Sequence, residues 1–141
     1  PPLAAPTAQL DSATVTGSTV LQVSKFLGIP FAQPPALSMG PACPQQAVEL
    51  PILQGLPADV VNFVVNTIYA AVFPDDEDCL TINVFKPASA TPGSKLPVVA
   101  WIFGGGFELG SPQMYDGAGI VERSIQLGQP VIYVSMNYRV T

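Results

Sequence analysis

The chain has 141 residues, of which 48% are apolar and 11% are charged, and ten Asp and Glu against five Lys and Arg give a formal net charge of −5. Five scattered cations cannot form the basic surface that nucleic-acid binding or a basic membrane-surface anchor requires, so both are excluded. The sequence has no run of about 18 apolar residues, which excludes a transmembrane span. It also has no histidine, so these residues cannot contain a complete catalytic Ser–His or Cys–His pair.

Sixteen prolines and twelve glycines predict many turns and a loop-rich organisation. The length corresponds to about one domain, but the charged fraction is less than half the roughly 25% of an ordinary soluble domain. We therefore expect much of the chain to be covered, as in a part of a larger molecule. The chain starts at Pro1 without an initiator methionine or a signal segment, so we expect a processed chain.

The N-terminal part predicts β structure. Residues 14–23 and 26–31 are short stretches rich in β-branched and aromatic residues, interrupted by Gly17 and Gly28, which is typical of a small antiparallel hairpin region. The prolines at positions 34 and 35 fix their own backbone and keep the preceding residue out of the helical region. An extended surface loop is therefore expected there.

An amphipathic helix is predicted between residues 56 and 73. Apolar residues recur there at helical spacing, namely Val60, Val61, Val64, Val65, Ile68 and Val72. Pro57 suits the first turn of a helix, and Pro74 ends it because proline cannot continue the hydrogen-bond ladder.

The second half predicts strands and a helix in alternation. Residues 80–85 alternate as in a strand with one face more buried, and residues 96–103 form a continuous apolar run typical of a central strand covered on both faces. Asp116 can cap a helix over residues 117–127, and residues 131–138 are a further β-rich run. This order predicts a βαβ crossover with two parallel strands, so the fold class is α/β.

Three consecutive glycines, Gly104 to Gly106, follow the apolar run and precede Phe107. Ligand sites in open α/β sheets favour this carboxyl edge, and glycines let several N–H groups converge on one oxygen, as in an oxyanion hole. The loop lacks the Lys-Ser/Thr of a phosphate loop and the G-x-G-x-x-G spacing of a dinucleotide site. A flexible turn explains the triplet alone equally well, so both interpretations stay open at this point.

Four sequence blocks together resemble the type-B carboxylesterase/lipase family. EDCLTINVFKP at 77–87 resembles the family signature, FLGIPFAQPP at 26–35 its N-terminal segment, and WIFGGGFELG at 101–110 its oxyanion strand and loop. Residues 137–140 fit as well, and the blocks occur in the family's order. The sequences of these blocks are most similar to those of secreted fungal lipases and sterol esterases, with cholinesterases as more distant relatives.

The resemblance implies the N-terminal portion of an α/β-hydrolase fold that cleaves carboxylic esters through a Ser-Glu-His triad, without a cofactor. Three parts of one domain are implied: a β region over 1–35, a lid loop over 43–79, and central-sheet strands with the oxyanion loop over 80–141. No Gly-x-Ser-x-Gly elbow occurs in the chain. The triad is therefore expected in the remainder of the hydrolase chain, and these residues alone should be inactive.

The resemblance also assigns roles to the glycine loop. By position, Gly105 and Gly106 match the glycines whose amides face the oxyanion, and Gly104 and Phe107 would contact the substrate. Losing one such amide donor typically costs about 2.7 to 4 kcal/mol of transition-state stabilisation.

Cys43 and Cys79 are the only cysteines, an even pair in a chain whose resemblance implies secretion, so a disulfide is expected. Two thiols without histidine cannot fill a tetrahedral zinc site. The bridged loop contains the predicted amphipathic helix, and the resemblance implies that this loop is a mobile lid over the active site. A helix packed in the core is the alternative, because periodicity cannot separate the two.

The acidic run Asp75 to Asp78 lacks the spacing and the glycine of an EF-hand loop, so a solvated turn is expected rather than a metal site. The resemblance implies a structural ion pair for Glu77. Relatives usually continue after Pro35 with V-G-x-x-R-F, which this chain lacks, so the usual arginine partner is absent and the ion pair is in doubt. Glu108 and Asp116 are expected to be loop and cap residues.

These observations predict part of a secreted, extracellular lipase, sterol esterase or carboxylesterase that acts on ester substrates at a lipid–water interface. The alternative is a non-catalytic cholinesterase-like interaction protein or an inactive fragment, which the glycine triplet makes less favoured. An independent lipid-binding module is a third possibility, and its exposed sheet edges argue against it.

Overall fold

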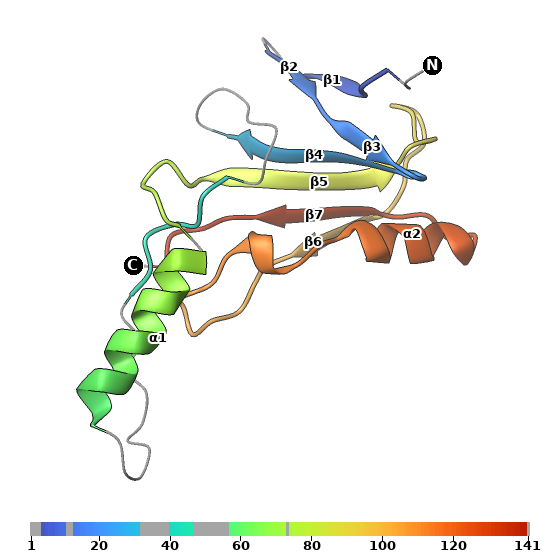
Figure 1. The fold of residues 1–141 in the computed structure, drawn as a ribbon. Coiled ribbons are helices and arrows are strands. Elements are labelled where there is room, and N and C mark those ends of the chain that lie inside the picture. Colours follow the sequence, from blue (N-terminus) through green and yellow to red (C-terminus); the bar gives the residue numbers. More distant parts are fainter. Residues whose placement is uncertain (1–3, 11–12, 32–39, 47–56, 73, 141) are drawn as a thin grey trace.

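The structure is a computed structural model that describes residues 4–10, 13–31, 40–46, 57–72 and 74–140. The proline loop at 34–35 and the stretch that lacks the family's V-G-x-x-R-F lie outside the described residues. The described chain forms seven strands and two α-helices with one 3₁₀ turn (Figure 1). The strands are β1 (Thr7–Leu10), β2 (Ala13–Thr16), β3 (Ser18–Val20), β4 (Val23–Pro30), β5 (Thr81–Pro87), β6 (Val98–Trp101) and β7 (Ile132–Met136).

The strands form one small sheet and one mixed sheet. β1 and β2 pair antiparallel, and the larger sheet has the order β3-β4-β5-β7-β6. Its neighbouring strands are antiparallel except β6 and β7, which run parallel and are joined through the helix α2 (Ala118–Gln126). This is the predicted βαβ unit, and the α/β class is confirmed.

The N-terminal β region matches the prediction in part. β3 and β4 form an antiparallel hairpin, Gly17 lies between β2 and β3, and Gly28, with φ +60°, lies where the register of β4 shifts between Phe26 and Ile29. Glycine suits this position because a positive φ is strained for other residues. The sequence reasoning missed β1, which is short and mostly exposed.

Helix α2 begins and ends close to the predicted residues. The N-cap residue is Gly117, without a side-chain cap, so the predicted cap at Asp116 is wrong by one residue. Asp116 still satisfies a backbone group of the first turn, because its carboxylate accepts from the N–H of Ala118 at 2.9 Å. The chain leaves the helix through Gly128, whose φ of +69° is the left-handed conformation common after a helix end.

The core packs α2 against one face of the mixed sheet. Val23, Phe85, Val121 and Tyr133 form its buried cluster, and the rings of Phe85 and Tyr133 meet edge to face with centroids 5.7 Å apart. Burial is the main cause that raises the pKa of the Tyr133 hydroxyl above its usual value, with smaller contributions from Asp116 and Tyr115. This tyrosine is therefore a neutral core residue.

Replacing Gly117 with alanine should destabilise this core. A Cβ at Gly117 would lie 2.0 Å from Cδ1 of Tyr133, and such overpacking typically costs about 1–3 kcal/mol. Urea unfolding of the complete protein measures the change. Gly119→Ala, in the first turn of α2, is the matched control, because a Cβ there meets nothing within 4 Å. Equal unfolding free energies for the two variants would contradict the prediction.

The position of β6 corrects the sequence interpretation. Residues 96–103 were expected to form a central strand covered on both faces, but β6 is the edge strand of the sheet, and all four of its residues are exposed. The apolar side chains of this run favour burial. In the described chain, however, β6 is the last strand of the sheet, and its side chains are not buried by other residues. The middle strand is β5, whose alternate residues are buried as predicted.

The predicted amphipathic helix is α1 (Ala58–Val72). It begins after Pro57, whose carbonyl accepts from the N–H groups of Val60 and Val61. Figure 1 shows α1 projecting away from the sheet, so the helix does not pack against the sheet of the described residues. Among the side chains of α1 that the structure describes, five large apolar ones are exposed, namely Val60, Phe63, Val64, Ile68 and Val72. No helix in the described ranges is long and apolar enough to cross a membrane.

Candidate functional site

A disulfide between Cys43 and Cys79 anchors the segment that precedes α1, as predicted. Both cysteines are buried, and their Cα atoms lie 4.9 Å apart. Backbone hydrogen bonds continue this junction, because Ala42 donates to Pro74 and accepts from Asp76. The bridge therefore holds residues 40–46 beside the start of β5.

The ends of β6 and β7 bring two segments together at one edge of the sheet. Because these strands are parallel, residues 102–110 and 137–140 both leave from the carboxyl edge. The Tyr138 hydroxyl donates to the Phe103 carbonyl at 2.6 Å, and their rings stack with centroids 4.3 Å apart. These two contacts hold Tyr138 against Phe103, the residue that precedes the glycine loop.

The glycine loop itself is a hydrogen-bonded turn. The carbonyl of Gly105 accepts from the N–H groups of Glu108 at 3.1 Å and Leu109 at 3.2 Å. Gly105 has a φ of +146° and Gly106 a φ of +67°. A Cβ at Gly105 would lie 1.8 Å from the Leu109 carbonyl oxygen, so only glycine fits at this position.

The N–H groups of Gly105 and Gly106 form no hydrogen bond with another described residue, and Gly104 and Gly106 are exposed. Unpartnered N–H groups in a fixed turn can donate to a negatively charged oxygen. Phe107 follows with a φ of +64° and a side chain that is 78% exposed.

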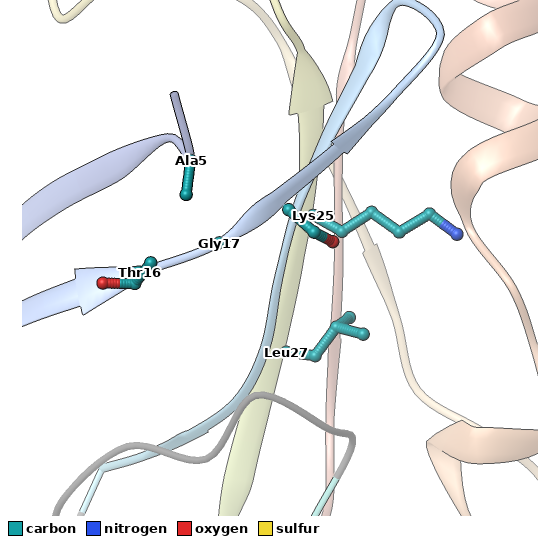
Figure 2. Close-up of a pocket in the computed structure, with 6 residues that line it drawn as sticks. Ala5, Thr16, Gly17, Lys25 and Leu27 are labelled. Atoms are coloured by element: carbon teal, nitrogen blue, oxygen red, sulfur yellow. The ribbon is translucent and has the colours of Figure 1, made fainter. Parts of the chain in front are cut away.

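Two surface cavities lined by described residues lie away from the glycine loop. One, of about 290 Å³, lies between the β1–β2 hairpin and β4 and is lined by Ala5, Thr16, Gly17, Ser18, Lys25 and Leu27 (Figure 2). Figure 2 shows the Lys25 side chain directed away from Ala5 and Thr16, and its Nζ lies 3.3 Å from Asp116 Oδ2. The other, of about 600 Å³, is lined by residues of β1 and of the β5–β6 connection, with Lys86 of β5 and Ile132 of β7. Neither includes a residue of the glycine loop.

Glu77 has an ion-pair partner that the sequence reasoning missed. Its Oε2 lies 2.6 Å from an Nη1 atom of Arg139, with both side chains at least half exposed. The doubt about this ion pair, raised by the missing V-G-x-x-R-F stretch, is therefore removed by a different arginine. Such an exposed pair contributes little stability. No group of three acidic, cysteine or histidine residues in the described parts of the chain is placed to hold a metal ion.

The mixed sheet, its parallel βαβ unit and the glycine turn at the carboxyl edge define an α/β-hydrolase fold. A crystal structure of Aspergillus niger EstA is similar with a TM-score of 0.69 and 29% identity, over 96% of this chain and 26% of that chain. A sequence model of the carboxylesterase family matches residues 4–141. The chain belongs to the carboxylesterase family.

Curated relatives add detail to this assignment. Lipase 2 of Diutina rugosa is 42% identical over 159 positions, 97% of this chain and 29% of the relative. Secreted lipase 1 of Botryotinia fuckeliana (strain B05.10) is 39% identical over 97% of this chain and 28% of the relative. An inactive carboxylesterase-like protein VdtD of Byssochlamys spectabilis is 33% identical over 92% of this chain.

The chain spans less than a third of the length of these lipases. The alignment with Lipase 2 covers 159 positions, more than the 141 residues of this chain. The relative therefore carries residues that this chain lacks, in agreement with a missing segment.

Proposed function

We propose that this chain is the N-terminal part of a secreted serine ester hydrolase that cleaves long-chain esters, such as acylglycerols or steryl esters, at a lipid–water interface. One observation carries the proposal: the Gly105 and Gly106 amides have no acceptor among the described residues and lie in a turn that requires glycine, at the carboxyl edge of the sheet. Membership of the carboxylesterase family and the similarity to secreted fungal lipases support the ester chemistry and the extracellular location.

The proposed reaction is acyl transfer through a serine outside this chain. The serine oxygen attacks the ester carbonyl carbon while a histidine takes the hydroxyl proton. The carbonyl oxygen becomes an oxyanion that accepts hydrogen bonds from the N–H groups of Gly105 and Gly106, and from the amide after the serine. The histidine returns the proton to the leaving alcohol, and water then hydrolyses the acyl-enzyme by the same steps. The glycine amides lower the barrier because they are fixed before charge develops.

Gly104 and Phe107 are proposed to contact the substrate. Gly104 is exposed, and a Cβ there would meet nothing within 4 Å, which leaves room for an ester beside the turn. Phe107 holds a left-handed conformation that costs a non-glycine residue roughly 1–2 kcal/mol. Strain of this kind concentrates at functional sites, and the exposed ring offers an apolar surface to an acyl chain.

The helix α1 is proposed to act as the lid. Its exposed apolar side chains form one face, and full burial of such side chains is worth about 1.5–3 kcal/mol each. This face would therefore favour either the apolar mouth of the active site or a lipid surface over water.

Two substitutions on α1 test the lid. Phe63→Ser together with Ile68→Ser, in the complete protein, should lower activity on an emulsified long-chain ester by about fivefold or more, since partial burial of the two side chains is lost. Activity on a soluble short-chain ester should hardly change. Leu127→Ser, an apolar residue 61% exposed against 59% for Ile68, is the control away from α1. An equal effect on both esters would contradict the lid.

The hydrolase assignment is tested by intact mass and by labelling. The protein that carries this sequence should have a mass at least three times the 14.7 kDa of this chain, and a fluorophosphonate should label one activated serine in it. The second candidate, a non-catalytic family member, is favoured by the similarity to the inactive protein VdtD. It predicts a long protein without labelling or ester hydrolysis.

A further inference from the structure

The segment that follows Cys43 is fastened to the glycine loop by two hydrogen bonds. The Gly110 N–H donates to Oε1 of Gln45 at 2.5 Å, and the Gln46 N–H donates to the Glu108 carbonyl at 2.8 Å. The Gln45 carboxamide also donates through Nε2 to the Cys43 carbonyl. One side-chain amide thus links the buried disulfide to the end of the glycine loop.

Gly110 is placed to transmit this contact through the turn. It is buried, its φ is +128°, and a Cβ there would lie 2.7 Å from the Phe103 ring and 2.9 Å from the Gly104 carbonyl oxygen. The backbone of Gly110 therefore packs directly against the start of the turn. Its neighbour Leu109 donates to the Gly105 carbonyl, so a shift of Gly110 moves the peptide that carries the Gly106 N–H.

We propose that Gln45 is a positioning residue for ester hydrolysis: it holds Gly110 and thereby sets the direction of the Gly105 and Gly106 amides. This inference rests on the proposed function. A carboxamide suits the task because it accepts from Gly110 and donates to the Cys43 carbonyl at once, without placing a charge near the developing oxyanion. Gln45 does not touch the substrate in this scheme.

Gln45→Met keeps the side-chain length and removes both hydrogen bonds. In the complete protein it should lower kcat by about 10- to 100-fold and leave KM within about twofold, because misplaced amides weaken binding of the transition state alone. Gln46→Met is the matched control. The Gln46 side chain donates to the Val140 carbonyl, and its contact with Glu108 is made by the backbone, which the substitution retains. Equal kcat losses for the two variants, or a Gln45→Met kcat above half of wild type, overturn the proposal.

Gln45→Glu supplies a second readout that a general structural role would not move. A protonated carboxyl can accept from the Gly110 N–H and donate to the Cys43 carbonyl, like the carboxamide. A carboxylate has no proton for the Cys43 carbonyl, and the repulsion between the two oxygens should turn the side chain away from its place beside Gly110. The ratio of variant to wild-type kcat should therefore rise toward one as the pH falls below about 5, near the usual carboxyl pKa. This variant also serves if Gln45→Met fails to fold, and a ratio that does not change with pH overturns the proposal.

Amide hydrogen exchange separates this inference from the proposed function. In the complete protein, Gln45→Met should raise exchange in the peptide covering residues 104–110 by about tenfold or more, and Gln46→Met should not. A wild-type protein that neither hydrolyses esters nor binds a fluorophosphonate would end the proposed function, while exchange would still decide whether Gln45 holds the loop. Unchanged exchange in Gln45→Met overturns the proposal.

Discussion

Gly105→Ala is expected to abolish most of the ester hydrolysis by the complete protein, lowering kcat by about 10²- to 10³-fold, the loss typical of one missing oxyanion donor. The new Cβ would lie 1.8 Å from the Leu109 carbonyl oxygen, and the φ of +146° is closed to other residues. The turn must therefore move, and its amides move with it. Steady-state kinetics on a soluble ester measures the change.

Two further glycine variants show whether geometry causes this loss. At Gly106 the φ of +67° is strained for alanine, but a Cβ meets nothing within 4 Å. Gly106→Ala should therefore lower kcat by only about 10-fold, which corresponds to the roughly 1–2 kcal/mol cost of a left-handed residue. Gly119→Ala on α2 should leave kcat unchanged. A Gly105→Ala protein with wild-type thermal stability and more than about a tenth of the wild-type kcat contradicts an oxyanion role for the turn.

Removing the Cys43–Cys79 bridge should have the largest effect on stability. The bridge closes a separation of 36 residues, and constraining a loop of that size in the unfolded chain corresponds to roughly 4 kcal/mol. Cys43→Ala with Cys79→Ala should lower the free energy of unfolding by about that amount. Alanine is preferred to serine because both positions are buried and a hydroxyl there would need a hydrogen-bond partner.

The control for this prediction is the wild-type protein under a reductant. Its free energy of unfolding, measured in urea, should fall to that of the double variant, whose own stability should not respond to the reductant. A loss smaller than about 1 kcal/mol in both cases would mean that the bridge constrains the unfolded chain little.

The sequence predicted those elements whose signals are local. The helix between Pro57 and Pro74 appears where the rules for helix ends put it, and α2 begins within one residue of its predicted start. The pairing of β6 with β7 follows from the strand, helix, strand order. The apolar run at β6 misled the interpretation. Hydropathy shows that the side chains of a strand favour burial, but it does not show whether other residues of this chain bury them. β1 was missed because a short, exposed strand carries little pattern.

The candidate site was predictable only where glycine marked it. The triplet after β6 signals a special backbone, and Gly105 proves to be sterically required. Gln45, Tyr138 and Arg139 each form a hydrogen bond with a residue at least 35 positions away, and the residues next to them in the sequence carry no pattern that predicts these contacts. The partner of Glu77 illustrates this, because family resemblance pointed to an arginine in a stretch that the chain lacks.

The exposed edge of β6 has a consequence for biosynthesis. Ribosomes add about 5–20 residues per second, and the lipase relatives are more than three times as long as this chain. In a protein as long as these relatives, on the order of half a minute would pass before any strand beyond residue 141 could cover Val98, Val99 and Trp101. During that time the exposed apolar edge of β6 is a site for aggregation or for chaperone binding.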